Sequence, residues 1–137
     1  MSRGWEWMAS ASCAGVDPAD ADKMFNLDRA HGDRPDTVRG RGVCEGCPVA
    51  AECLAQAIAL HETSGLWAGL NVRVRRLVAR RAAAAGVLPA RGRGACDPGA
   101  LAEWIRANPG EIDAARRDDL DAHRRCKAVR RSRADTA

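Results

Sequence analysis

Residues 43–53 read VCEGCPVAAEC and carry three cysteines, Cys44, Cys47 and Cys53. The first two have the spacing C-x2-C, and Pro48 follows at the first position of a predicted helix. Apolar residues then recur at helical spacing, which places Cys53 on the buried face of that helix. The stretch therefore predicts three thiols gathered around one helix N-terminus.

An isolated cysteine upstream, Cys13, is the natural fourth ligand and gives the pattern C-x30-C-x2-C-x5-C. The dipole and free N–H groups of a helix N-terminus favour thiolates and an anionic iron–sulfur cluster. A structural zinc site more often shows two short C-x2-C knuckles. On spacing alone, three interpretations stay open: an iron–sulfur cluster, a zinc ion, or a thiol–disulfide pair.

The composition limits what else the chain can be. Its 137 residues fit one domain, or one small domain with an extension. With one Phe, no Tyr and four Trp, the core is thin, so a bound inorganic centre would help the chain to fold. No stretch resembles a signal peptide or a membrane span. We expect a cytoplasmic protein with no membrane partner, in which six cysteines serve metal or redox chemistry.

Charge is divided unevenly along the chain. Residues 1–70 hold 6 Lys and Arg against 10 Asp and Glu, a net charge of −4. Residues 71–137 hold 16 against 8, a net charge of +8, and nearly all of the basic residues are Arg. Arginine suits bidentate contacts to phosphates and guanine edges. The pattern predicts a metal-binding head followed by a nucleic-acid-binding tail.

The secondary structure expected from the sequence is all-α. Asp17, Asn71 and Asp97 are predicted to cap helix N-termini, while Gly65 and Gly86 are predicted to end helices. The polar, glycine-rich segment before Cys44 (26–43) is expected to be a flexible loop, and 87–99 a linker. The expected helices are 5–13, 18–25, 48–62, 72–85, 98–107 and 111–133.

Four features together resemble the WhiB-like family of actinobacterial and phage transcription factors. They are Cys13 followed by Asp17-Pro18, the C-x2-C-P-V-x-x-x-C run, a Gly-Leu-Trp-Ala-Gly turn at 65–69, and the arginine-rich helix after it. The resemblance implies a [4Fe-4S] cluster held by Cys13, Cys44, Cys47 and Cys53. It further implies a small helical domain organised around this cluster and docking on a sigma factor (residues 1–86). A linker and a basic helical C-terminal extension follow (87–137).

The turn resembles the G-[VI]-W-G-G turn with which the family docks on the principal sigma factor of RNA polymerase. The corresponding residues here are Gly65, Leu66, Trp67, Ala68 and Gly69. Leu66 replaces the usual Val or Ile at similar volume. Ala68 replaces a glycine, and its side chain resists the positive φ that glycine accepts. Trp67 is expected to cover the cluster and to anchor the sigma interface.

An arginine-rich segment is expected to contact promoter DNA. The helix after the turn packs five Arg into nine positions, and Arg91-Gly92-Arg93 resembles the core of an AT-hook that enters the minor groove. General phosphate binding explains the whole segment. The candidate DNA-binding residues are Arg73, Arg75, Arg76, Arg80, Arg81, Arg91 and Arg93.

We therefore expect a redox-responsive transcriptional regulator with no catalytic turnover and no small-molecule substrate. Two alternatives remain. One is a thiol–disulfide oxidoreductase using Cys44 and Cys47, because apo forms of the family have been discussed as disulfide reductases. The other is a zinc-stabilised DNA-binding module. Cys96 and Cys126 fall outside the cluster pattern and are expected to be free thiols, with a disulfide on oxidation as the minority interpretation.

Overall fold

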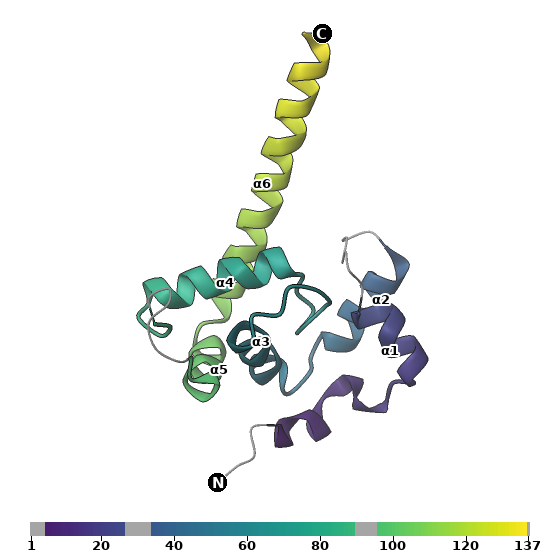
Figure 1. The fold of residues 1–137 in the computed structure, drawn as a ribbon, viewed down its shortest axis with the longest axis vertical. Coiled ribbons are helices and arrows are strands. Elements are labelled where there is room, and N and C mark those ends of the chain that lie inside the picture. Colours follow the sequence, from purple (N-terminus) through teal and green to yellow (C-terminus); the bar gives the residue numbers. More distant parts are fainter. Residues whose placement is uncertain (1–4, 27–33, 90–95, 137) are drawn as a thin grey trace.

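The computed structural model describes residues 5–26, 34–89 and 96–136, and within them it is helical, without a β-strand. The all-α prediction is confirmed (Figure 1). No helix in these ranges is long and apolar enough to cross a membrane. The elements are the 3-10 helices η1 (Glu6–Ser10) and η2 (Ser12–Gly15), followed by α1 (Pro18–Phe25), α2 (Pro35–Cys44), α3 (Ala50–Ala59), α4 (Val72–Ala84), α5 (Pro98–Ala107) and α6 (Pro109–Asp135).

The predicted caps hold three of the helices. The Asp17 carboxylate accepts a hydrogen bond from the Ala19 amide at 2.9 Å at the start of α1. The Asn71 side chain accepts one from the Val74 amide at 3.0 Å at the start of α4, and Asp97 caps α5 in the same way. Each cap satisfies amides that the first turn of a helix leaves without a partner.

The prediction of a flexible loop over 26–43 is wrong for residues 35–43, which belong to α2 (Pro35–Cys44). The glycine at position 40 allows α2 to pack closely on its neighbours. A Cβ at the buried Gly40 would lie 2.9 Å from the Met24 carbonyl oxygen and 2.9 Å from Leu66 Cδ2. The missing side chain lets α2 approach α1 closely, and burial of the helix outweighs the low helix propensity of glycine.

The C-terminus of α3 differs from the prediction that Gly65 ends it. His61, with φ 52°, adopts the left-handed conformation directly after the helix. The His61 amide donates to the Ile58 carbonyl and the Glu62 amide to the Ala57 carbonyl, which is a Schellman motif. At the end of α4, Gly86 makes the equivalent arrangement with φ 78°, as predicted.

One hydrophobic core joins the cysteine-bearing part of the chain to its C-terminal part. Helix α5 packs along α3, and the first turns of α6 pack along α4. The core thus contains residues from both sides of the predicted boundary at residue 86. The boundary separates the cysteine-bearing sequence from the basic extension, but the hydrophobic core continues across it. Its fully buried members include Leu54, Ala55, Val78, Ala82, Leu101 and Ala115.

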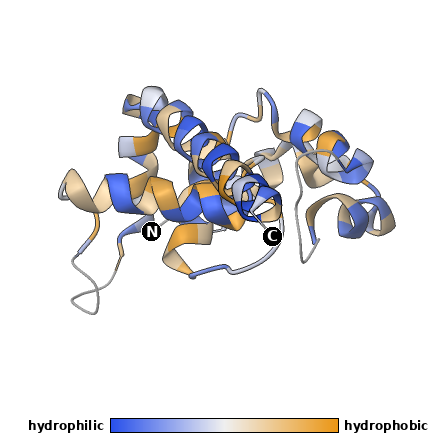
Figure 2. Ribbon diagram, turned by 90° about the horizontal axis from the view of Figure 1, so that it is seen from above, coloured by the Kyte–Doolittle hydropathy of each residue, from blue (hydrophilic) through white to orange (hydrophobic). Residues whose placement is uncertain are grey.

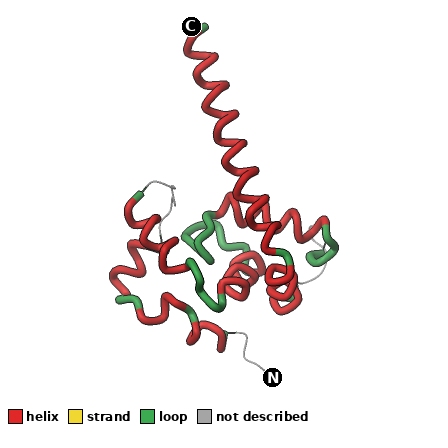
Figure 3. The backbone as a smooth tube through the Cα atoms, turned by 180° about the vertical axis from the view of Figure 1, so that it is seen from behind, coloured by secondary structure: helices red, strands yellow, loops and turns green. Residues whose placement is uncertain are grey.

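Helix α6 extends far beyond this core. Its first half lies against α4, and its second half projects from the body of the molecule as a single rod (Figures 1 and 3). Every residue from Asp121 to Thr136 is exposed. The N-terminal half of α6 therefore packs against the body of the protein, and its C-terminal half is surrounded by solvent.

Candidate metal centre

The segment between α3 and α4 forms a tight hairpin turn. Trp67 and Leu70 exchange backbone hydrogen bonds, 3.2 Å from the Trp67 amide and 2.9 Å from the Leu70 amide. Both central residues have positive φ, 53° at Ala68 and 74° at Gly69, which is the signature of a type I′ turn. Ala68 therefore adopts the conformation that its side chain was expected to resist.

This turn directs two backbone amides at two of the predicted ligands. The Ala68 amide donates a hydrogen bond to the Cys53 sulfur, and the Gly69 amide donates one to the Cys44 sulfur. A Cβ on Gly69 would lie 3.4 Å from Cys44 Cβ, so the turn and this cysteine are in contact. The turn thus contributes donors that sequence spacing did not reveal.

The other two predicted ligands, Cys47 and Cys13, lie beside η2 and within it. The Ser12 amide lies 3.5 Å from the Cys47 sulfur, and the Ser12 hydroxyl and the Val49 amide also donate to that sulfur. Cys13 follows Ser12 in η2, where it is exposed, and its charge acts on both Cys44 and Cys53. The four cysteines of the sequence pattern are therefore neighbours in the fold.

Burial and amide donors separate the acidities of these thiols. Burial raises the pKa of Cys53 to about 11 and also raises the pKa of Cys44, although the turn amides oppose both shifts. Burial acts in the same direction on Cys47, but the donors from Ser12 and Val49 outweigh it and lower the pKa of that thiol. Positive charge of a bound metal centre would favour all the thiolates.

A buried arginine locks the turn to α4. The Arg75 guanidinium donates to four backbone carbonyls, those of Glu62, Ser64, Gly65 and Leu70, at 2.7 to 3.2 Å. The residue is only 3% exposed, and burial lowers its pKa. The sequence predicts Arg75 as a DNA-binding arginine, but its guanidinium faces the protein interior. Its helical spacing with Val74, Val78 and Ala82 was the signal that it lies on the buried face.

Gly65 fixes the turn to the N-terminal part of the chain. The Leu66 amide donates to the Phe25 carbonyl at 2.8 Å. A Cβ on Gly65, whose φ is 76°, would lie only 2.6 Å from the same oxygen. A residue with a side chain cannot occupy this position without separating the turn from α1.

Comparison with known proteins identifies this arrangement. A family model described as "Transcription factor WhiB" matches residues 7–78, just over half of the chain. The chain belongs to the WhiB family of transcription factors. The matched range contains all four cysteines, the turn and most of α4.

Individual members of the WhiB family agree with this assignment. The redox-responsive transcriptional regulator WhiB3 of Mycolicibacterium smegmatis is 35% identical over 81 residues, covering 56% of this chain and 79% of that protein. The transcriptional regulator WhiB2 of Mycobacterium tuberculosis is 35% identical over 75 residues, covering 55% and 75%. WhiD of Streptomyces coelicolor is 36% identical over 69 residues, covering 49% of this chain and 59% of WhiD.

The spread of the thiols bears on which inorganic group this WhiB-family chain can hold. Within the described ranges, no three His, Cys, Asp or Glu side chains are grouped closely enough to hold one metal ion. The four thiols nevertheless act on one another electrostatically. A zinc ion draws its ligands to about 2.3 Å from one point, whereas a [4Fe-4S] cluster presents four irons, each taking one thiolate. Four thiolates are the donor set that such a cluster takes.

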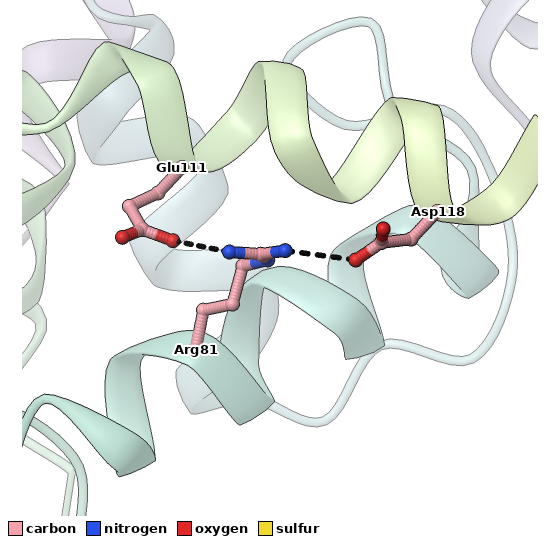
Figure 4. Close-up of polar contacts among 3 residues, drawn as sticks. All are labelled: Arg81, Glu111 and Asp118. Carbon is pink, nitrogen blue, oxygen red and sulfur yellow. Dashed lines mark hydrogen bonds and ion pairs between the residues drawn. The ribbon is translucent and has the colours of Figure 1, made fainter.

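The arginines of α4 have different environments. Arg73 pairs with Asp119 at 3.4 Å, and Arg81 donates to Glu111 and Asp118, both at 2.8 Å (Figure 4). These carboxylates raise the pKa of Arg81. The two remaining cations that we predicted on α4, Arg76 and Arg80, are exposed. Arg91 and Arg93 lie outside the described residues.

The tryptophans and the two extra cysteines are placed as follows. Trp67 is half-buried beside Gly65, and Trp5 and Trp7 stack with ring centroids 6.4 Å apart. Trp104 packs against the core from α5. Cys96 and Cys126 are both free thiols, and Cys96 lies partly buried against the core.

Proposed function

We propose that this WhiB-family protein is a redox-responsive regulator in which Cys13, Cys44, Cys47 and Cys53 hold a [4Fe-4S] cluster. The observation that carries the proposal is that Cys44 and Cys53 lie beside the Trp67–Leu70 turn and that the charges of Cys13 and Cys47 act on both of them. Such a cluster, when bound, supplies an oxidisable cross-link between separate segments of the chain. The name of the relative WhiB3, a redox-responsive regulator, supports this function.

The turn is the element through which the state of the thiols would reach partners. Its amides donate to Cys44 and Cys53, and its carbonyls hold Arg75 of α4. Loss of the cross-link would free η2 from α3 and release the turn. We propose that residues 65–69, with the half-buried Trp67 at their centre, dock on the principal sigma factor.

Promoter DNA is the second proposed partner, bound through the exposed arginines. Arg76 and Arg80 are exposed on α4, and Arg91 and Arg93 follow in the chain. We also propose a division of labour, in which residues 1–86 bind the cluster and sigma factor while 87–137 complete the core and support DNA binding. Cytoplasmic location is part of this proposal, because sigma factor and DNA are both found there.

Anaerobic purification followed by visible absorption and iron, sulfide and zinc analysis tests the cluster. We expect a broad charge-transfer band and about four iron and four sulfide per chain. Cys13→Ser should abolish the band, whereas Cys126→Ser, which changes an exposed thiol on α6, should leave it unchanged. A colourless protein with about one zinc per chain would overturn the proposal in favour of a zinc-stabilised module.

A further inference from the structure

Charge is segregated along α6. The half that packs on α4, residues 109–121, contains five carboxylates and two arginines. The projecting half, residues 122–135, contains a single carboxylate, Asp135, at its last position. Six cations occupy this half, which we call the tip: Arg124, Arg125, Lys127, Arg130, Arg131 and Arg133.

The acidic half of α6 neutralises part of α4. Its residues Glu111, Asp118 and Asp119 pair with Arg81 and Arg73, so these two arginines already have carboxylate partners at the surface of the molecule. Figure 4 shows α6 lying along α4 where Arg81 bridges Glu111 and Asp118. The strongest concentration of exposed positive charge in the described residues is consequently on the tip, and not on α4.

Few internal partners neutralise the tip. Arg124 approaches Asp121 at 3.8 Å, with both side chains mostly exposed, and such a surface pair contributes little. Six cations on an unsupported helix repel one another, which destabilises it. Arg117, Arg124 and Arg131 recur every seven residues, with Lys127 between them, so they form one basic face. A polyanion along this face would offset the repulsion.

The exposed apolar residues argue against a membrane or a helical partner. Leu120 and Val129 are about half exposed, but they stand nine residues apart, about two and a half turns, and so face opposite sides. Membrane-surface helices and coiled coils both need a continuous apolar stripe. Figure 2 shows hydrophilic residues dominating the projecting helix, with isolated hydrophobic ones.

We propose that the tip of α6 is a binding element for duplex DNA that lies in the major groove. At about 1.5 Å per residue it is roughly 21 Å long, and a helix about 10–12 Å wide fits a groove about 12 Å wide. The deep, narrow major groove of duplex RNA does not admit such a helix. This inference rests on the proposed function in DNA binding, and it moves the principal contact from α4 to a part of the chain outside the matched family region.

The test compares two matched double variants of the full-length protein. Arg124→Gln with Arg131→Gln removes two cations from the basic face of the tip. Arg76→Gln with Arg80→Gln removes two exposed cations from α4, with the same change in net charge. Fluorescence anisotropy measures binding to a labelled DNA duplex of about two helical turns over a range of salt concentrations. Circular dichroism of each variant checks that the helices are retained.

We expect the tip variant to bind about tenfold or more weakly and to lose about 2 from the slope of log Kd against log salt, since each phosphate contact contributes about 0.9. The α4 variant should show a smaller loss. If the tip variant binds as tightly as wild type while the α4 variant binds more weakly, the proposal that the tip binds DNA is wrong. The proposed function in DNA binding is then retained. Tighter binding of wild type to duplex RNA or to anionic vesicles also overturns it. Absence of DNA binding by wild type overturns both proposals.

Discussion

Ala68 holds a left-handed backbone, with φ 53°, although its side chain disfavours that conformation. The neighbouring Gly69 holds φ 74° without such a cost. Left-handed backbone costs a non-glycine residue about 1–2 kcal/mol, part of which is offset because alanine loses less chain entropy on folding. The turn therefore stores strain next to the thiols of Cys44 and Cys53.

We predict that Ala68→Gly stabilises the protein by about 1 kcal/mol, because glycine accepts the positive φ. Thermal unfolding followed by circular dichroism should show Tm raised by about 4 °C. Gly69→Ala is the matched opposite change and should destabilise by about 1–2 kcal/mol, since it adds strain and a contact at 3.4 Å to Cys44 Cβ. A lower Tm for Ala68→Gly would contradict the assigned turn.

The thiols themselves give a second prediction at this scale. In the cluster-free protein at about pH 8, iodoacetamide should alkylate Cys47 well before Cys53, because the thiolate is the nucleophile. The pKa of Cys47 is lowered, while burial raises that of Cys53 to about 11. Alkylation of Cys53 should accelerate about tenfold per pH unit until the pH approaches 11. Mass spectrometry of the labelled peptides reports the order, and its reversal would refute the assigned environments.

At the scale of helices and turns, local signals identified most boundaries and tertiary contacts decided the rest. Asp17, Asn71 and Asp97 cap helices as expected, because a cap depends only on the first turn after it. Helix α2 was not predictable in this way. Its glycine content indicated a loop, whereas in the fold Gly40 allows the helix to pack closely on α1.

In the candidate site, too, some features could be predicted from local sequence and others depend on tertiary contacts. Cys13, Cys44, Cys47 and Cys53 could be chosen from spacing and resemblance, since ligand spacing is a local property of the chain. The amide donors of the turn could not, because they depend on the fold bringing residues 68 and 69 to α3 and α2. Arg75 shows both effects. Its charge indicated a ligand for phosphate, whereas its position on the buried face of α4 directs it to backbone carbonyls.

Replacement of Arg75 tests whether the turn depends on α4. Arg75→Lys keeps a positive charge but cannot reach four carbonyls in a planar fork, so buried acceptors lose their donors. We expect a loss of about 2–4 kcal/mol in the free energy of unfolding, measured with urea. The neighbouring exposed residue is the control, and Arg76→Lys should change it by less than about 0.5 kcal/mol. Equal effects of the two variants would show that the hydrogen bonds from Arg75 do not stabilise the turn.

For the molecule as a whole, the question is whether residues after 86 fold as part of the family domain. Leu101 of α5 is completely buried in the core shared with α3 and α4. Arg106 of α5 also forms an ion pair with Glu52 of α3, next to Cys53. The C-terminal part is thus joined to the helix that carries one of the candidate ligands, so the two parts should gain and lose structure together.

Two Leu→Ala variants measure this coupling. Leu101→Ala should destabilise the protein by about 2–5 kcal/mol, because it leaves a cavity in the shared core. Leu120→Ala removes the same atoms from a residue that is 56% exposed on α6, and should cost less than about 0.5 kcal/mol. If the core is continuous, denaturant unfolding of Leu101→Ala stays a single transition in which helicity and tryptophan fluorescence change together. Two separated transitions, with the cysteine-bearing part unaffected, would instead mean that the segments on either side of residue 86 fold independently.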